Sequence, residues 1–199
     1  MLDNKQPGDK LRIGYVSGDF KKHSVAYFFE PLLVNHNFNV VETFCYYNDH
    51  VIDAVTKRLI TASNHWRSIY QISDLNAVDL IKNDKIDILV DLSGHTAKNR
   101  LLIFAQKPAP IQVTWLGYVN TTGLSAIDYR FTDIITDPIG DADELHSETL
   151  LRLTNGFQCY KGDETIFMDR KLPQKSNGYI TFGSFNNFSK ITPEIIKVW

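Results

Sequence analysis

Short polar side chains that could act on a ligand follow an apolar stretch near the middle of the chain. Asp91, Ser93, His95 and Thr96 come directly after the stretch Ile86–Val90. Ligands rich in hydroxyl groups, such as sugars, need hydrogen-bond donors and acceptors of this kind. The alternative is a structural turn, in which Asp91 caps local amides and His95 is solvated. Spacing alone does not decide between the two interpretations.

His23 lies shortly after the first apolar stretch, Leu11–Ser17. A histidine at the carboxyl end of a strand can take up a proton near neutral pH, which suits general acid–base chemistry. Position alone favours the plainer interpretation of His23 as a surface turn residue.

A second polar tip, Gly117–Gly123, follows the apolar stretch Ile111–Trp115. It holds the paired threonines Thr121 and Thr122, together with Tyr118, between two glycines. Paired threonines can bind a ligand, but an ordered loop is the favoured interpretation of this stretch by itself.

The segment Gly183–Lys190 precedes a predicted helix that Thr192 caps and Pro193 begins. Free amides at a helix N-terminus, together with the Lys190 ammonium group, suit a diphosphate. Glu194 in the first turn would compete with a bound anion, so an ordinary capped helix with a solvated lysine is favoured from this stretch alone.

Several common motifs are absent from the sequence. There is no G-x-x-x-x-G-K-[ST] phosphate loop and no G-x-G-x-x-G after the first predicted strand, so a dehydrogenase-type dinucleotide fold is not supported. No histidine or cysteine pattern with metal-ligand spacing occurs, and we expect no metal site. No G-x-S-x-G marks a serine hydrolase.

The elements that must position these residues alternate between strand-like and helix-like patterns, which predicts an α/β fold with a mostly parallel sheet and flanking helices. Helices are predicted after Ser24 as N-cap (with Pro31 kinking or shortening this helix), over Asp49–Ala62, over Asp74–Lys82 with Ser73 as cap, and after Thr96. Pro138–Glu144 is predicted to be a loop. Strands are predicted at Leu11–Ser17, Asn39–Tyr46, His65–Ile69, Ile86–Val90, Ile111–Trp115, Asp128–Thr136, Leu150–Leu153 and Tyr179–Phe182.

The chain is predicted to contain one lobe and the start of another. Residues 1–10 form an N-terminal extension, 11–162 the first lobe, 163–178 a linker and 179–199 the beginning of a second, truncated lobe. The pattern stops within a helix, which suggests a fragment of a larger protein. Without its own core, the segment 179–199 should dock on the first lobe, pair with another chain or be poorly ordered.

Composition is that of an ordinary globular protein. The formal charge of the 199 residues is -2, which gives no indication of nucleic-acid or membrane-surface binding. Two cysteines without a C-x-x-C motif suggest buried free thiols in a reducing compartment. No apolar run approaches the ~20 residues of a membrane span, and the N-terminus lacks a signal-peptide core. We therefore expect a cytoplasmic protein.

Four stretches together resemble the catalytic region of the O-GlcNAc transferase and SPINDLY family of protein glycosyltransferases. They are LRIGYVSGDFKKHSVAYFFEPL, DKIDILVDLSGHTAKNRL, PAPIQVTWLGYVNTTGLSAIDYRFTD and FGSFNNFSKITPE, and they cover nearly the whole chain from Leu11 onward. In detail they are more similar to the SPINDLY branch and its bacterial relatives than to animal O-GlcNAc transferase. One departure is Val119, where the family commonly has proline.

The resemblance implies a GT-B architecture, in which two Rossmann-like lobes enclose the active site. Such enzymes invert the anomeric centre, use a nucleotide sugar and need no catalytic metal or other cofactor. Their partners are protein acceptors, bound with the help of upstream tetratricopeptide repeats that are not present in this sequence. The family histidine falls on His23 and the family lysine, which neutralises the leaving diphosphate, on Lys190; Asp91 and His95 match the family pattern D-L-x-G-H-T.

The resulting hypothesis is transfer of N-acetylglucosamine from UDP-GlcNAc to serine or threonine of a protein, with the fragment inactive alone. The alternatives are protein O-fucosylation from GDP-fucose, and a non-catalytic binding or scaffolding lobe. The residues assigned by motif are catalytic His23, Asp91 and His95; substrate-binding Thr96, Gly117, Tyr118, Thr121 and Thr122; and diphosphate-binding Asn187, Lys190 and Thr192.

Overall fold

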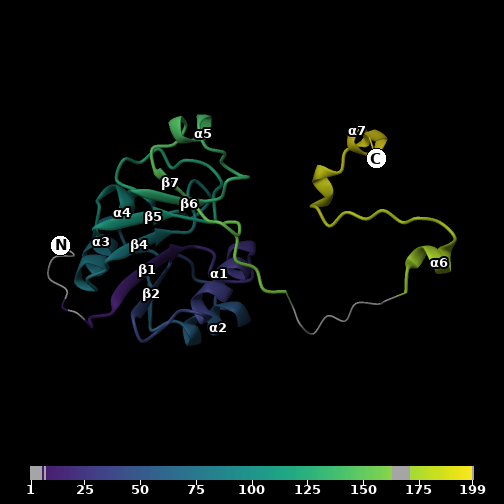
Figure 1. The fold of residues 1–199 in the computed structure, drawn as a ribbon. Coiled ribbons are helices and arrows are strands. Elements are labelled where there is room, and N and C mark those ends of the chain that lie inside the picture. The colour runs from purple at the N-terminus through teal and green to yellow at the C-terminus, as the bar shows by residue number, and fades with distance from the viewer. Residues whose placement is uncertain (1–5, 7, 163–170, 199) are drawn as a thin grey trace. The chain divides into compact units, whose positions relative to one another are not determined.

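The computed structural model describes residues 6, 8–162 and 171–198 (Figure 1). The chain divides into two compact units, Met1–Lys161 and Gly162–Trp199, and each is described by itself. The predicted extension 1–10 and the predicted linker 163–178 lie partly outside the described residues, and the last residue of the predicted second lobe, 199, lies outside them as well.

The first unit is built on one seven-stranded sheet in which every pairing is parallel, so the predicted α/β class is confirmed. The spatial order is β3-β2-β1-β4-β5-β6-β7. The strands are β1 Leu11–Ser17, β2 Val41–Tyr47, β3 His65–Ser68, β4 Ile88–Asp91, β5 Ile111–Thr114, β6 Tyr129–Thr132 and β7 Thr149–Arg152.

Both faces of the sheet are apolar, because successive side chains of a strand point to opposite faces. Along β1, Tyr15 joins one core cluster and Val16 joins the other. On β4, Val90 and Leu89 divide in the same way. The central strands are therefore buried on both sides, and only their ends are free to carry a site.

Helices cover the two faces in pairs. The helices α1 (Ser24–Val34) and α2 (Ala54–Ala62) pack on the cluster that holds Tyr15. The helices α3 (Asp74–Asn83) and α4 (Leu101–Ala105) pack on the cluster that holds Val16. Figure 1 shows α1 beside α2, with α3 and α4 on the other side of the sheet.

Two helices start at a different residue from the predicted one, because a different side chain caps each of them. The N-cap of α1 is His23, whose ring accepts from the Val25 amide, and Ser24 is the first helical residue. The helix α2 starts at Ala54 instead of Asp49, because Asp53 forms a capping box with Thr56. The predicted Ser73 cap of α3 is confirmed by its bond from the Asn76 amide.

Two further predictions about helices differ from the structure. Of the two effects predicted for Pro31, a kink or a shorter helix, shortening does not occur, since α1 continues to Val34. The stretch Pro138–Glu144 is not a plain loop, because Asp141–Glu144 forms the single turn α5.

The predicted strand Asp128–Thr136 ends at Thr132, because the Asp133 carboxylate accepts from two following amides and turns the chain.

The second unit contains short helical elements: α6 (Pro173–Asn177), the 3-10 turn η2 (Phe188–Lys190) and α7 (Pro193–Val198). Pro193 begins α7 as predicted, and the Thr192 hydroxyl accepts from the Ile195 amide at 3.4 Å. The predicted strand Tyr179–Phe182 is not formed, since it has no neighbouring strand to share hydrogen bonds. Across both units, the described helices are all too short or too polar to span a membrane.

Leu89→Ala tests the central position of β4. Leu89 is 0% exposed, so its truncation should lower the free energy of unfolding by about 2–5 kcal/mol through lost burial and the cavity left behind. Leu75→Ala is the matched control, because Leu75 is 65% exposed and its loss should cost no more than ~0.5 kcal/mol. Urea unfolding of both variants measures the difference, and equal losses would contradict the assigned core.

Candidate active site

The loops that carry the predicted site residues meet where the sheet changes direction. The strands β1 and β4 are neighbours, while the chain leaves β1 towards β2 and leaves β4 towards β5. In open parallel sheets, the carboxyl ends of two such strands form a crevice that binds ligands. His23 follows β1, Asp91 ends β4 and His95 follows it, so all three lie at this point.

Asp91 is buried at the end of β4, where it is 1% exposed. Its carboxylate accepts from the amides of Ser93 (3.1 Å) and Gly94 (2.8 Å) and from the Thr114 hydroxyl (2.8 Å). The strand register pairs Asp91 with Thr114, which explains the last contact. Burial raises the pKa of Asp91, although these hydrogen bonds oppose the rise. Asp91 therefore shapes the turn and does not reach the surface.

The tips after β4 and β5 pack so closely that they require glycine. A Cβ atom on Gly94, which has φ +51°, would lie 2.3 Å from the Cβ of Tyr118. A Cβ atom on Gly117 would lie 2.0 Å from the carbonyl oxygen of Leu92. The structure thus brings together the two polar tips predicted from sequence, and their glycines make the contact possible.

His95 is exposed and joins the two tips. Its Nε2 lies 2.9 Å from the carbonyl oxygen of Thr122, and its ring meets the Tyr118 ring edge to face at 5.3 Å. A carbonyl oxygen can only accept, so Nε2 must carry a proton. In the neutral ring, Nδ1 is then the nitrogen with a lone pair. His95 is therefore not simply solvated. Its ring is fixed by Thr122 and Tyr118, and its Nδ1 is free to accept a hydrogen bond in the neutral ring.

Thr96, Thr121 and Thr122 use their hydroxyls within the protein. Thr96 donates to the Ser93 carbonyl at 2.7 Å. Thr121 donates to Glu148 at 2.8 Å, and Thr122 donates to the same carboxylate through its hydroxyl and, at 2.8 Å, its amide. These side chains order the tips, which agrees with the plainer interpretation of Gly117–Gly123.

Glu148, directly before β7, was not predicted from the sequence. It is 4% exposed, and burial would raise its pKa. The hydrogen bonds from Thr122 and Thr121 outweigh this effect, so the pKa of Glu148 lies below its usual value. The second tip thus rests on a carboxylate that is 26 residues away from Thr122.

Arg130 is a second unpredicted support for this tip. It is 2% exposed, and its Nη1 donates to the carbonyls of Tyr118 (3.2 Å) and Asn120 (2.9 Å). Val119 lies between these anchored residues and is 61% exposed. The loop is therefore held by hydrogen bonds on both sides of Val119.

His23 lies at the start of α1 with its side chain 42% exposed. Its Nδ1 accepts from the Val25 amide at 3.3 Å and lies 3.8 Å from an oxygen of Asp19. In the neutral ring, this leaves Nε2 as the protonated nitrogen, which donates. Among the described residues, no hydrogen bond joins His23 directly to the tips.

The three residues predicted to bind a diphosphate belong to the second unit. Asn187 caps η2, its side-chain oxygen accepting from the Ser189 amide at 3.1 Å. Lys190 ends η2 and is exposed, and Thr192 precedes α7. They form a local cluster along the chain.

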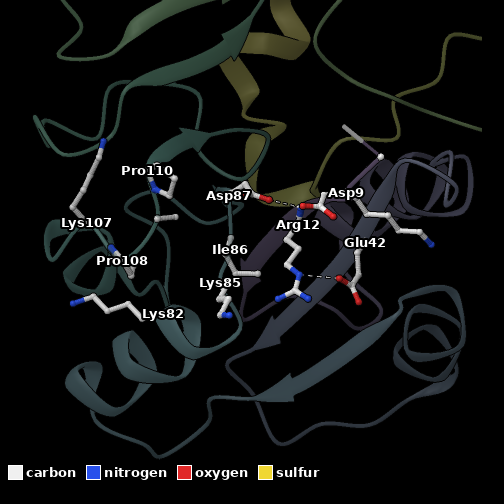
Figure 2. A pocket seen from close by; sticks show the side chains of 13 residues that line it. Asp9, Arg12, Glu42, Lys82, Lys85, Ile86, Asp87, Lys107, Pro108 and Pro110 are labelled. Carbon is white, nitrogen blue, oxygen red and sulfur yellow. Dashed lines mark hydrogen bonds and ion pairs between the residues drawn. The ribbon is translucent and has the colours of Figure 1, made fainter. Parts of the chain in front are cut away.

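A broad hollow of about 1440 Å³ lies at the opposite edge of the sheet, around the amino ends of β1 and β4 (Figure 2). Arg12 reaches into it but bonds to Glu42 at 3.0 Å. Lys107 is paired with Asp128. This hollow contains none of the predicted site residues. Nowhere in the described chain do three or more histidine, cysteine or acidic side chains gather in a way that could hold a metal ion.

The chain was compared with known proteins. Residues 1–176 match the family model described as glycosyl transferase family 41. A tomato (Solanum lycopersicum) protein named "Probable UDP-N-acetylglucosamine--peptide N-acetylglucosaminyltransferase SPINDLY" is 45% identical, with 99% of this chain and 22% of the relative aligned. The corresponding SEC protein of Arabidopsis thaliana is 34% identical over 96% of this chain and 20% of its own.

A solved structure shows the same fold. It is a lysine-to-methionine mutant of Thermobaculum terrenum O-GlcNAc transferase, with a TM-score of 0.88 and 40% identity over 98% of this chain and 36% of that chain. The chain thus spans about a fifth of the length of the curated relatives and about a third of the solved one.

Glu148→Gln tests the support of the second tip. The amide cannot accept from both threonines and the Thr122 amide, so the free energy of unfolding at pH 7 should fall by about 1–3 kcal/mol. Because the pKa of Glu148 is lowered on folding, its stabilisation is present above the unfolded pKa and is lost as the pH falls through the folded value. Urea unfolding from pH 7 to acid should show a flatter decline in the variant, and an identical decline would contradict the assignment.

Proposed function

Because the chain belongs to glycosyl transferase family 41, we propose that it is the first lobe of a protein O-glycosyltransferase with a GT-B architecture. The enzyme transfers N-acetylglucosamine from UDP-GlcNAc to a serine or threonine hydroxyl of a protein. The names of the SPINDLY, SEC and O-GlcNAc transferase relatives support this donor and this class of acceptor. The observation that carries the proposal is that His23, Asp91 and His95 all come at the carboxyl ends of β1 and β4, at the switch point of the sheet.

The reaction needs three things from the protein. The acceptor hydroxyl attacks the anomeric carbon, the bond from this carbon to the diphosphate oxygen breaks, and the hydroxyl proton passes to a base or to solvent. Negative charge grows on the diphosphate as the bond breaks, and fixed donors stabilise it most when they are already in place. Lys190 and the amides near Thr192 are the proposed donors in the second lobe, with Asn187 shaping their turn.

The two histidines have different proposed roles, because their hydrogen bonds select different nitrogens. His95 donates through Nε2 to Thr122 and keeps a lone pair on Nδ1, so it can accept a proton or a hydroxyl hydrogen bond. His23 uses Nδ1 at the helix cap and offers an N–H, so it orients an oxygen of the substrate. His23 acts as a base only if it releases the Val25 amide.

The remaining assigned residues of the first unit either position the site or, in the case of Tyr118, belong to it. Asp91 is buried and holds the first tip, while Thr96, Thr121 and Thr122 use their hydroxyls in hydrogen bonds within the protein. Tyr118 is half-buried against His95 and is the tip residue that we propose to contact the sugar through its ring. Gly117 allows the tips to meet.

Two alternatives remain as outcomes of a test. GDP-fucose is the alternative donor, which the resemblance to SPINDLY permits. The residues that read the nucleotide base are expected in the second lobe, so the first lobe does not distinguish the two donors. A scaffolding lobe is the alternative of another class. Full-length protein given both donors separates them: transfer from GDP-fucose alone would replace the donor, and no transfer from either would contradict the enzyme.

His23→Ala and Lys190→Ala should each lower kcat of the full-length enzyme by about 100-fold or more, because each removes a proposed contact to reacting groups. His65→Ala is the control for the first change, since His65 pairs with Glu42 at the start of β3. Lys175→Ala in α6 is the control for the second. Radiolabelled sugar transfer measures all four, and near-normal rates in the first two would favour the scaffold.

Residues 1–199 alone should transfer no sugar above background, since the chain covers only 36% of the solved transferase it matches. The same assay with the full-length enzyme at equal concentration is the control. Transfer by the short chain would show that the site is complete within it.

A further inference from the structure

Asp49, just after β2, has a buried carboxylate that is shared by two lysines. Its side chain is 0% exposed. The ammonium groups of Lys21 and Lys98 both donate to the same oxygen, Oδ2, and the second of these bonds is 2.5 Å long. The other oxygen accepts from the His50 amide at 2.7 Å. Both oxygens of the carboxylate therefore have partners, and the His50 Nδ1 also lies 3.0 Å from Oδ1.

The two lysines come from the two loops that carry the histidines. Lys21 lies two residues before His23 in the loop after β1, and Lys98 lies three residues after His95 in the loop after β4. The Asp49 carboxylate thus connects the His23 loop to the His95 loop. Among the described residues no hydrogen bond joins His23 directly to the tips, so the link between the two loops is the indirect one through Asp49.

Asn48 and Gly18 strengthen the same junction. The Asn48 amide donates to the Ser17 carbonyl at 2.9 Å, and its side chain donates to the Lys98 carbonyl at 2.9 Å. A Cβ atom on Gly18 would lie 2.9 Å from the Cβ of Lys98. The loops after β1, β2 and β4 are therefore in contact, and Asp49 lies at the centre of the contact.

The charge of Asp49 is strongly stabilised. Burial alone would raise its pKa, but the hydrogen bonds from Lys21 and Lys98 hold the pKa well below its usual range. The carboxylate stays ionised at neutral pH. Of the nearby acids, Asp53 caps α2, and an oxygen of Asp19 lies 3.8 Å from His23 Nδ1. A buried charge with two partners is costly to disturb, because removing one side leaves the other uncompensated.

We propose that Asp49 is a positioning residue for sugar transfer, which sets the separation of His23 and His95 by clamping their loops through Lys21 and Lys98. This inference rests on the proposed function for its kinetic readout. Its geometry can also be measured without any activity.

The kinetic test uses the full-length enzyme. Asp49→Asn keeps the shape of the side chain but removes the charge, and Lys98→Met removes one arm of the clamp. We expect kcat/KM to fall at least tenfold in each, mainly through kcat, and the double variant to be no more than twofold worse than Asp49→Asn.

Asp128→Asn is the matched control. Asp128 also accepts from a lysine, Lys107, at 2.5 Å and from a backbone amide, that of Gln112, at 2.7 Å. It lies at the amino edge of the sheet, away from the histidines. Its kcat/KM should stay within twofold of wild type, whatever its effect on Tm.

The geometric test places spin labels on cysteines at the exposed positions Lys22 and Ala97, after replacement of Cys159. Double electron–electron resonance should give one narrow distance in the otherwise wild-type protein and in Asp128→Asn, and a broad or shifted one in Asp49→Asn. If Asp49→Asn does not fold, Lys21→Met and Lys98→Met carry the same test.

The outcomes separate the two proposals. An unchanged distance distribution in Asp49→Asn and both lysine variants overturns the clamp, as does normal kcat/KM in all three. Equal kinetic losses in Asp49→Asn and Asp128→Asn also overturn it, because the effect would then be one of general stability. A wild-type enzyme with no transfer from either donor contradicts the proposed function, while the distance measurement still decides the clamp.

Discussion

The carboxylate of Asp91 is the interaction on which the candidate site depends. It lies at the end of the central strand, buried, with its three acceptor contacts made by two amides of its own turn and a hydroxyl of the next strand. These contacts hold Gly94 in its left-handed conformation, which lets Tyr118 of the second tip approach. Without the turn, His95 would not reach Thr122. The position of one buried charge thus fixes two loops.

Glu148 holds the second tip through its own hydrogen bonds, but its pKa is shifted in the opposite direction to that of Asp91. The pKa of Asp91 is raised because burial outweighs its hydrogen bonds, whereas the pKa of Glu148 is lowered because the threonine hydrogen bonds outweigh burial. Asp91 therefore favours the folded state more as the pH falls through its range, and Glu148 favours it more as the pH rises. The pKa shifts of the two carboxylates thus act on stability in opposite directions as the pH changes.

The sequence predicted the strands of the site well, and the supports of the site poorly. Leu11–Ser17 was correct at both ends because its apolar run is bounded by polar residues. Chain order then placed the polar tips at one edge. Asp49 and Glu148 could not be found, since their partners lie 49 and 26 residues away and no local pattern records such a distance. Tyr179–Phe182 failed for a related reason, because a strand requires a neighbour that local propensity does not describe.

The tautomer of each histidine also depends on contacts that sequence cannot supply. His95 faces a carbonyl, which can only accept, and His23 faces an amide, which can only donate. The ring nitrogen that is left for a ligand therefore differs between the two side chains. It is Nδ1 with a lone pair in His95, and Nε2 with a proton in His23. The proposed sugar transfer can use both kinds of group, an acceptor for the hydroxyl proton and a donor for an oxygen. The backbone partners thus assign the two histidines distinct chemistry, and the buried carboxylates of Asp91 and Asp49 hold the loops in which the histidines lie.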